Sequence, residues 1–491
     1  MFVLKLYNSL TKEVEVFSPV IDGEKLILYV CGITPYDSAH IGHARTFVFF
    51  DLLKRFLKYR NYGVFHIQNI TDVDDKIIRR CRETLQNPIT LTSFHHDEAL
   101  TLFDRLNVIR ADVYPKVTEH IDEIIQVCSE IEKRGFAYKT KTGLYFSVSS
   151  FENYGKLSGQ NMDEIEKGAR IEVDETKKDP ADFALWKNTS GEIIEFNSKY
   201  GSGRPGWHIE CSAMSLKYSR RTLDIHGGAR DLIFPHHENE IAQSESATNH
   251  QFAKYWIHTG FLTVNGEKMS KSLGNFVTLK DALDEFSPNA IRLFFLMAHY
   301  RAPLDYSQEI LSSMEESVNR IFNSLGLILE AIEKGKNSSF EDLVFRKKCD
   351  DLFNSIEANL DNDLNTPEAL SHFFTLLRLC NSHLTSSNVD VSALRNVYSK
   401  LNLILDVFGL KQPVSNLDSK KNPLDEILIS LGESPKIDTS SSLDFLVELR
   451  QTARKNKDFK KSDLIRDKLL AAGILLEDSK QGVKWKVIDK Q

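Results

Sequence analysis

The chain contains few cysteines, and they are widely scattered. Only six occur in 491 residues, and no two of them form a C-x-x-C pair. A disulfide framework is not expected at this density, and a reducing cytosol fits the pattern better. Cysteines in that setting are usually small buried hydrophobes, unless they bind a metal or act as nucleophiles.

Long apolar runs and a dominant charge sign are also missing. No stretch approaches the roughly 20 apolar residues that span a bilayer, and the N-terminal MFVLKLYNSLTKEVE lacks the pattern of a secretory signal. Lysine and arginine number 62 against 69 aspartates and glutamates, a net charge of −7. This excludes a strongly basic surface over the whole chain, but not a local basic module. The composition, with 41% apolar and 27% charged residues, is that of a globular protein of about three domains.

The first 70 residues predict a βαβ unit. An apolar run at residues 26–30, LILYV, is followed by Gly32 and Pro35, then by apolar residues at helical spacing over 47–57, then by a second β-rich run over 64–70. Parallel strands of this kind are buried on both faces. We therefore expect a Rossmann-like, doubly wound α/β domain whose ligand lies at the carboxyl ends of its strands.

Changes of pattern along the chain predict its domains. We expect the Rossmann-like catalytic domain at 1–109 and 204–262, a connective insertion at 110–203, a region at 263–305 that opens with a hairpin at Asn265-Gly266, a helical bundle at 306–410, a linker at 411–442 and a small module at 443–491. The last 45 residues hold twelve lysines and arginines against seven acidic residues, with a helix expected from Leu446 to Leu470. A binding site for a polyanion and a solvated helical face both explain this charge.

Two motifs carry residues suited to nucleotide chemistry. In His40-Ile41-Gly42-His43, two imidazoles lie where the first helix should begin, and a helix N-terminus attracts phosphate. In Lys268-Met269-Ser270-Lys271-Ser272, two ammonium groups follow the hairpin and could neutralise a polyphosphate as charge builds on it. A structural histidine pair and a plain surface loop are the alternatives, but their joint occurrence favours nucleotidyl transfer.

Longer strings resemble one family. The two motifs are similar to the HIGH and KMSKS signatures of class I aminoacyl-tRNA synthetases. Further strings resemble those of the cysteinyl-tRNA synthetases, and they are YVCGIT at 29–34, NITDVDDKI at 69–77, GRPGWHIECSAM at 203–214 and FPHHENE at 234–240. The similarity runs essentially from end to end. It implies a monomeric cytoplasmic enzyme that activates L-cysteine with ATP and Mg²⁺ and transfers it to tRNA(Cys), with no membrane partner.

The resemblance also implies roles for particular residues. His40, Gly42 and His43 would bind ATP, and Lys268 and Lys271 would be catalytic with the two histidines. Residues 263–305 would be the KMSKS and stem-contact region, and 443–491 an anticodon-binding module. One Zn²⁺ would be held by Cys31, Cys211, His236 and Glu240, cysteine by Thr71, Trp207, His226 and Asp231, and the anticodon by Arg454, Asp463 and Asp478.

The residues themselves leave the metal site open. Two sulfurs, one imidazole and one carboxylate suit Zn²⁺, and His236 and Glu240 share a face if that segment is helical. The ligands are too dispersed to identify by spacing, and His237 and Glu238 compete within the same string. Buried thiols are the alternative reading.

One string departs from the family pattern. Where the family has His-Gly-Gly-Gly, this chain has His226-Gly227-Gly228-Ala229 followed by Arg230, which leaves the role of Asp231 open.

Three other functions fit parts of the chain. A ligase that joins cysteine to a small amine would not need the basic tail. A catalytically silent tRNA-binding relative would not need intact motifs, and a generic nucleotidyltransferase would leave residues 306–491 unexplained.

Overall fold

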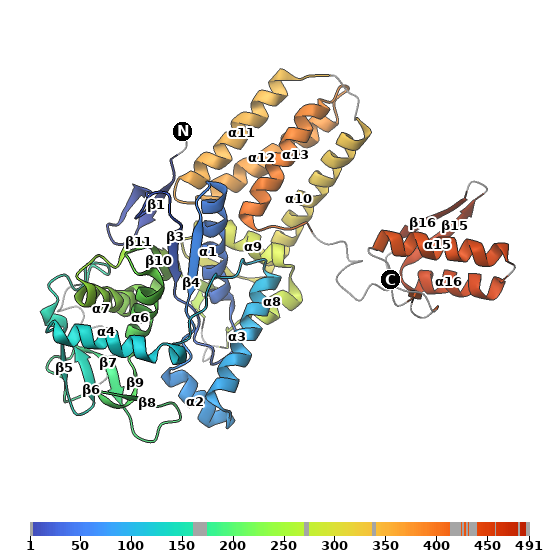
Figure 1. The fold of residues 1–491 in the computed structure, drawn as a ribbon. Helices are drawn as coiled ribbons and strands as arrows, with labels where there is room; N and C mark the ends of the chain where they lie inside the picture. Colours follow the sequence, from blue (N-terminus) through green and yellow to red (C-terminus); the bar gives the residue numbers. More distant parts are fainter. Residues whose placement is uncertain are drawn as a thin grey trace. The chain divides into compact units, whose positions relative to one another are not determined.

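The computed structural model describes residues 3–160, 174–269, 274–335 and 340–412, and parts of 424–487. Two compact units divide the chain, Met1–Lys411 and Gln412–Gln491 (Figure 1). Each unit has its own core and is described by itself. Among the described residues, no helix is long and apolar enough to cross a membrane.

A four-stranded parallel sheet forms the centre of the first unit. Its strands lie in the order β11-β10-β3-β4, with bounds β3 Leu26–Val30, β4 Val64–Gln68, β10 Leu223–Ala229 and β11 Ala253–Thr259. The chain leaves β3 to one side for β4 and later reaches β10 on the other side. The predicted doubly wound fold is thus confirmed, and the crevice at the carboxyl end of β3 is its switch point.

Alternate residues of β3 face opposite layers. Leu26, Leu28 and Val30 pack in one core with helix α1 (Ile41–Tyr59), which runs back along the sheet. Ile27 and Tyr29, with Cys31 just beyond the strand, pack in another core with residues of α6 (Trp207–Ser219) and α7 (Glu238–Thr248). The period of two in an extended chain therefore directs Cys31 toward the face that α6 and α7 cover.

The connection from β4 to β10 carries the insertion. It begins with α2 (Asp75–Thr84), α3 (Pro88–Arg105) and α4 (Ile121–Lys133). A five-stranded antiparallel sheet in the order β5-β6-β7-β9-β8 follows, with strands Ala137–Lys139, Gly143–Phe146, Phe183–Asn188, Gly201–Pro205 (β9) and Phe196–Ser198 (β8). The predicted insertion thus contains a sheet of its own, and its strand β9 continues through Pro205.

Two small sheets flank the parallel one. Near the N-terminus, β1 (Lys5–Asn8) pairs with β2 (Glu13–Val16). Beyond β11, strands β12 (Leu262–Val264), β13 (Glu267–Lys268) and β14 (Leu304–Tyr306) form a second sheet. Asn265 and Gly266 have φ of 51° and 78°, which confirms the predicted hairpin turn. Helices α8 (Leu279–Glu285) and α9 (Pro288–Leu296) follow the hairpin.

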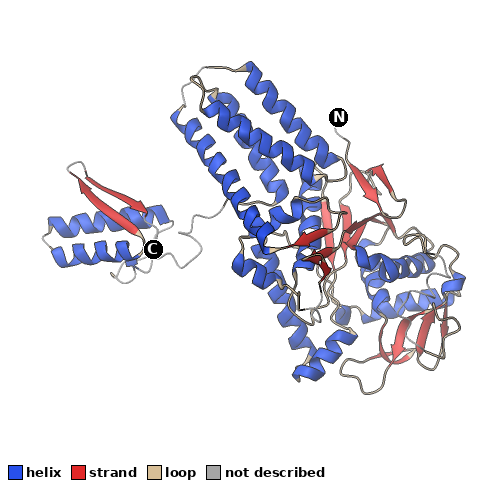
Figure 2. Cartoon of the chain, turned by 180° about the vertical axis from the view of Figure 1, so that it is seen from behind, coloured by secondary structure: helices blue, strands red, loops and turns tan. Residues whose placement is uncertain are grey.

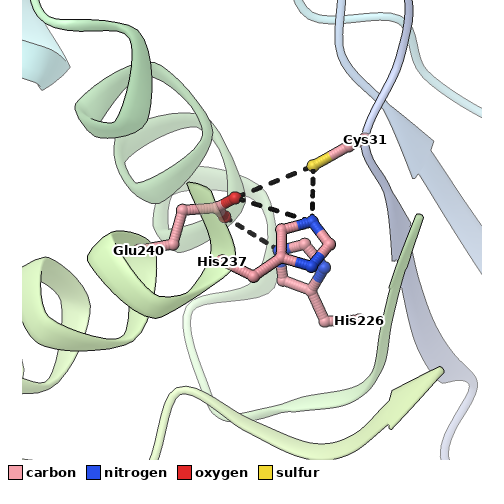
Figure 3. A group of neighbouring side chains, drawn as sticks. All are labelled: Cys31, His226, His237 and Glu240. Atoms are coloured by element: carbon pink, nitrogen blue, oxygen red, sulfur yellow. Dashed lines mark hydrogen bonds and ion pairs between the residues drawn. The ribbon is translucent and has the colours of Figure 1, made fainter. Parts of the chain in front are cut away.

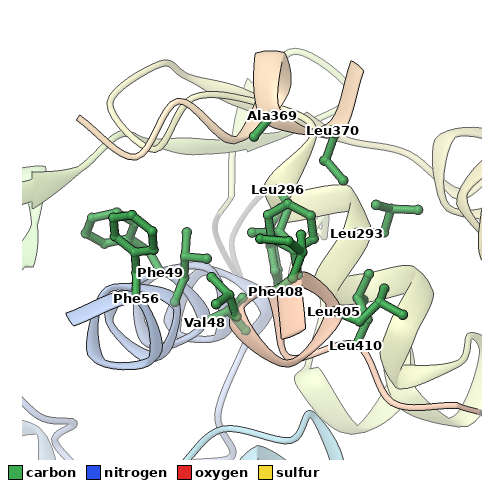
Figure 4. Close-up of a cluster of buried hydrophobic side chains, with 14 of the residues drawn as sticks. Val48, Phe49, Phe56, Leu293, Leu296, Ala369, Leu370, Leu405, Phe408 and Leu410 are labelled. Carbon is green, nitrogen blue, oxygen red and sulfur yellow. The ribbon is translucent and has the colours of Figure 1, made fainter. Parts of the chain in front are cut away.

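Four helices confirm the predicted bundle. They are α10 Gln308–Lys334, α11 Leu343–Asp361, α12 Thr366–Leu384 and α13 Val391–Phe408. Figure 4 shows how Phe408 and Leu405 of α13 pack with Val48 of α1 and Leu293 of α9, so that bundle and sheet share a core. A buried ion pair between Arg292 and Asp51, 2.6 Å long, reinforces this junction.

The second unit holds α15 (Thr439–Lys455), α16 (Phe459–Ala471) and a hairpin of β15 (Ile474–Ser479) and β16 (Gly482–Val487), all visible in Figure 2. The single helix predicted from Leu446 to Leu470 is wrong. The chain breaks after α15, and Asp458 starts α16 by accepting a hydrogen bond from the Lys461 N–H at 3.0 Å. A capping aspartate starts a new helix more readily than it continues an old one.

Candidate active site

The first motif caps helix α1 at the carboxyl end of the sheet. His40 is the N-cap residue, and its Nδ1 accepts a hydrogen bond from the His43 N–H at 3.3 Å. The two rings stack with centroids 3.5 Å apart. A Cβ at position 42 would lie 3.0 Å from His40 Nδ1, so Gly42 leaves room for this arrangement. Two imidazoles and the helix N-terminus together suit phosphate oxygens.

His43 is a neutral imidazole at neutral pH. Burial, followed by the neighbouring His40 and Lys76, holds the pKa of His43 well below its usual range. A neutral ring can donate a hydrogen bond through one nitrogen while the other accepts.

The chain on both sides of the second motif packs against the first. The Ile41 N–H donates to Val277 O at 3.2 Å, and the Leu279 N–H donates to Ala39 O at 2.8 Å. Met269 Cε lies 3.7 Å from the position of a Cβ on Gly42. Lys271 lies outside the described residues, as does the side chain of Lys268, which ends β13. Met269 and the residues that follow the second motif therefore lie against the first motif.

Four predicted metal ligands converge around the carboxyl end of β3. Cys31 follows β3, Cys211 lies in α6, Glu240 lies in the first turn of α7, and His236 lies in the short helical turn Ile233–His237 just before α7. The Sγ atoms of Cys31 and Cys211 are 4.0 Å apart, Cys31 Sγ lies 3.7 Å from Glu240 Oε1, and His236 Nε2 lies 3.0 Å from that same oxygen. All four side chains are buried. Their ligand atoms lie within 4.8 Å of one another.

The charges in this cluster favour metal binding. Burial raises the pKa of Cys211, but hydrogen bonds with Cys31 and His236 outweigh burial and lower it to about 6. Burial likewise raises the pKa of Glu240, yet His226 and His236 bring it down to about 2. These surroundings favour the thiolate of Cys211 and the carboxylate of Glu240, and a divalent cation would balance both charges.

The donor set fits zinc. Tetrahedral ligands with Zn–S bonds of about 2.3 Å place two sulfurs about 3.8 Å apart, close to the observed sulfur separation. A second group, Cys31, His226, His237 and Glu240, shares two of its ligands with the first (Figure 3). It offers one sulfur in place of two, so the set with Cys211 suits a thiophilic ion better.

His237 and Glu238, the competing ligand candidates in the string at 234–240, have other partners. Glu238 turns toward the insertion, where its carboxylate accepts hydrogen bonds from the N–H groups of Gly155, Leu157 and Ser158. His237 Nε2 lies 3.3 Å from Cys31 Sγ, and its Nδ1 lies 2.8 Å from His258 Nε2. Glu238 therefore anchors a loop of the insertion to the start of α7, whereas His237 lies at the edge of the cluster.

The predicted cysteine-pocket residues lie at different depths. Trp207 is 39% exposed and stacks on His236 with centroids 4.2 Å apart. His226 is buried and contacts Glu240 Oε2 at 2.8 Å. Thr71 is buried in the loop after β4, where it accepts a hydrogen bond from Asn69 at 3.1 Å. Asp231 is exposed in the turn after β10, so the structure brings Trp207 and His226 to the cluster but leaves Asp231 at the surface.

The departure from the family string is accommodated at the end of β10. A Cβ on Gly228 would come within 2.8 Å of Leu232 and 3.1 Å of His237, so both side chains would have to shift to admit a larger residue there. Ala229, the next residue, is half-buried, and Arg230 is exposed. The positive charge of Arg230 adds to burial and to His226 in lowering the pKa of His258 to about 3.

Three residues that sequence reasoning missed support the cluster. His208 Nδ1 lies 2.9 Å from His236 Nδ1, His258 contacts His237, and Ser9 Oγ lies 2.8 Å from His258 Nδ1. Such partners fix the orientation of metal ligands. His208 lies within a string that signalled the family, but Ser9 and His258 carried no signal, because only the fold brings β1 and β11 together.

The predicted anticodon residues lie in the second unit. Arg454 near the end of α15 and Asp463 in α16 are exposed, and Asp463 lies 3.6 Å from Arg466. Asp478 belongs to β15, but its side chain is outside the described part of the structure. Both described side chains therefore face solvent, where a ligand can reach them.

Comparison with known proteins decides the family. Residues 17–316 match the model "tRNA synthetases class I (C) catalytic domain", and residues 355–412 match the "DALR domain". Proteins named cysteine–tRNA ligase from Thermococcus onnurineus and Maridesulfovibrio salexigens are 44% and 43% identical to this chain, over 99% of it and 99% and 100% of their own lengths. The chain belongs to the cysteine–tRNA ligase family.

The fold agrees with this family assignment. A methionyl-tRNA synthetase of Mycobacterium tuberculosis, solved with methionyl-adenylate, superposes with a TM-score of 0.61 at 16% identity. The match covers 84% of this chain and 94% of the other. At that identity only the fold is shared. The class I synthetase architecture, with its parallel sheet and helical bundle, is thus common to two synthetases of different name.

Proposed function

We propose that this protein is a cysteine–tRNA ligase that works as a monomer in the cytoplasm. The observation that carries the proposal is the convergence of Cys31, Cys211, His236 and Glu240 at the carboxyl end of β3, the strand that leads into the capped helix α1. A thiol-binding cluster and a phosphate-binding helix end then meet in the crevice where doubly wound folds bind ligands.

The first half-reaction joins cysteine to AMP. A carboxylate oxygen of L-cysteine attacks the α-phosphorus of ATP, which comes with Mg²⁺, and the bond to the bridging oxygen breaks to release pyrophosphate. No protein nucleophile is needed, so positioning and charge stabilisation supply the catalysis. His40, Gly42 and His43 hold phosphate oxygens, and Lys268 and Lys271 neutralise the charge that develops between the α- and β-phosphates.

The buried cluster supplies the selection of cysteine. Serine differs from cysteine by oxygen in place of sulfur, and a packing pocket separates near-isosteres poorly. Zn²⁺ held by the four residues would provide a soft acceptor for the substrate thiolate. Trp207 then forms one wall, Thr71 lines the pocket and His226 faces the carboxylate. Asp231, which is exposed after β10, would approach the ammonium from the solvent side.

The second half-reaction uses tRNA(Cys). A hydroxyl of the terminal ribose attacks the carbonyl carbon of the adenylate, the cysteinyl ester forms and AMP leaves. The second unit would hold the anticodon through Arg454, Asp463 and Asp478, since arginine and acidic side chains read base edges.

Amino-acid-dependent exchange of pyrophosphate into ATP tests this function. Exchange with cysteine should exceed exchange with serine by orders of magnitude, and the purified protein should carry one zinc per chain. Cys211→Ser should lose zinc and cysteine exchange together. Cys128→Ser, at another buried thiol with its Sγ 3.9 Å from Leu185 O, is the matched control and should keep both. Equal exchange with serine, or an active Cys211→Ser protein without zinc, would contradict the proposal.

A further inference from the structure

A cavity of about 610 Å³ lies between helices α10 and α12 of the bundle. Residues of α10 from Ser317 to Leu327 and residues of α12 from Pro367 to Asn381 line it at spacings of three and four, so each helix contributes one face. Met297, just after α9, also lines it. Its volume is in the range of about 300–1,000 Å³ that small-molecule sites occupy, and grooves between bundle helices are common places for such sites.

A hydrogen bond fixes the register of the two helices. Asn381 Nδ2 donates to Ser324 Oγ at 2.8 Å. Consecutive helices of the bundle run in opposite directions, so α10 and α12 run in the same direction (Figure 1). Arg320 and Arg378 each lie about one helical turn before this bond. The two arginines therefore flank the cavity at the same level, one from each helix.

These two arginines have hydroxyl groups but no carboxylates as partners. Arg320 Nη2 donates to Ser317 Oγ at 2.8 Å, and Arg378 Nη2 donates to Thr375 Oγ1 at 2.9 Å. Both arginines are exposed, and no acidic residue is among the described residues that line the cavity. A guanidinium group carries five N–H donors, so most of them remain available to an anion.

One polar atom next to the arginines has no partner. Asn381 Oδ1 is buried and makes no hydrogen bond with any described residue. Because the hydroxyl of Ser324 can accept as well as donate, the amide of Asn381 can bind it through either atom. The other atom can then be an N–H donor, and a buried polar group of this kind is usually satisfied by a partner. An anionic group between the two arginines would be such a partner.

The end of the cavity near the start of α12 is apolar. Leu370 is buried, Phe374 is half-buried, and Met297 is 45% exposed. The two chain neighbours of Met297 line a small cavity together with Thr366, the first residue of α12, which places Met297 at this end. Apolar surface and positive charge are thus separated along the groove.

We propose that this groove binds a small amphipathic anion. A carboxylate or phosphate head group lies between Arg320 and Arg378, and a hydrocarbon part lies along Leu370 and Phe374. Charge complementarity supports this ligand, since guanidinium groups bind carboxylate and phosphate through paired N–H donors. Burial of the hydrocarbon part supplies affinity. The site goes beyond the proposed function, because neither cysteine nor tRNA is its ligand.

Calorimetric titration of the full-length protein with decanoate, below the concentration at which it forms micelles, tests the site. Decanoate should bind saturably with one molecule per chain. Decanoate should bind about fourfold or more tightly than octanoate, because it buries two further CH₂ groups. Decyl phosphate in place of decanoate shows which head group the arginines prefer. Decyltrimethylammonium, with the opposite charge, should not bind.

Two variants test the charged and the apolar part separately. The double variant Arg320→Gln with Arg378→Gln should weaken decanoate binding by about tenfold or more, and Arg395→Gln, exposed on α13, is its control. Ser371→Trp, at an exposed position of the cavity lining, should abolish binding by filling the groove. Ser382→Trp, exposed on α12 outside the lining, is its control and should bind normally.

Melting temperatures and enzyme activity separate loss of the site from loss of the fold. Each variant should melt within about 2 °C of the wild type, and cysteine-dependent pyrophosphate exchange should stay within about twofold. Absence of saturable decanoate binding, or equal binding in the double arginine variant, would overturn the inference. So would variants that lower kcat/KM for tRNA but leave decanoate binding unchanged, since the groove would then be a surface for RNA.

Discussion

The sulfur atoms of Cys31 and Cys211 lie 4.0 Å apart although 180 positions separate them in the chain. The alternation of β3 directs Cys31 to one face of the sheet, and α6 crosses that face with Cys211 in its second turn. Glu240 in the first turn of α7 and His236 in the turn just before that helix complete the group. The proposed selection of cysteine would therefore depend on packing between β3 and the segments around α6 and α7, which the insertion separates from β3 along the chain.

Lys271→Ala should slow activation far more than it weakens cysteine binding. The ammonium is expected to act on charge that develops in the transition state, so its loss lowers the rate of adenylate formation. Rapid-quench measurements of adenylate formation at varied cysteine concentration separate the two effects. A large rise in the dissociation constant for cysteine with an unchanged rate would contradict this role.

Gly42→Ala should impair ATP use without unfolding the protein. The new methyl group would lie 3.0 Å from His40 Nδ1 and 3.7 Å from Met269 Cε, so the stacked histidine pair has to shift. We expect KM for ATP to rise by about tenfold, with a nearly unchanged melting temperature. Gly326→Ala, on α10 where a Cβ meets open space, is the control. Normal ATP kinetics in Gly42→Ala would show that the histidine pair does not hold phosphate.

Substitutions of Glu238 and Glu240 should have different effects on zinc content and stability, although the two residues are only two positions apart. Glu240→Gln removes a proposed ligand, so zinc content should fall. Glu238→Ala leaves the N–H groups of Gly155, Leu157 and Ser158 without their acceptor, and should cost about 2–4 kcal/mol of stability while the folded protein keeps its zinc. Urea unfolding and metal analysis of both variants check this. Zinc loss in Glu238→Ala alone would reverse the assignment.

The stability of the helical bundle should depend on pH through the carboxylate of Asp390. Asp390 is buried, pairs with Arg346 at 2.7 Å and caps α13, and these contacts outweigh burial and lower its pKa to about 2. A depressed folded-state pKa stabilises the fold above the unfolded pKa of about 3.9, and this contribution is lost as pH falls through the folded value.

The carboxylate should therefore contribute about 2 kcal/mol at pH 7, and progressively less between about pH 4 and pH 2. Urea unfolding of the wild type and Asp390→Asn at several pH values measures the difference. A difference that grows as pH falls would contradict the assignment.

Local sequence patterns were enough to predict much of the fold. The βαβ unit, the Asn265-Gly266 hairpin and the bundle follow from periodicity and turn chemistry, which neighbouring residues determine. The helix predicted over Leu446–Leu470 failed because the apolar spacing continues across Asp458, where a capping side chain ends the regularity.

The site could be predicted less well, because it is formed by contacts between residues that lie far apart in the sequence. The family resemblance offered Cys31, Cys211, His236 and Glu240 as ligands. Spacing alone could not separate His236 and Glu240 from the competing His237 and Glu238. Ser9 and His258 escaped notice because their contact depends on strands β1 and β11 lying together. A buried polar network is specified by tertiary packing, and its members leave little trace in local periodicity.

Zinc K-edge X-ray absorption of the purified protein, with and without L-cysteine, tests the central claim most directly. We predict two sulfur ligands with one nitrogen and one oxygen in the free protein, and a third sulfur when cysteine is added but not when serine is added. A metal with one sulfur and two nitrogens, as in the group of Cys31, His226, His237 and Glu240, would contradict the account. So would a sulfur count that cysteine leaves unchanged.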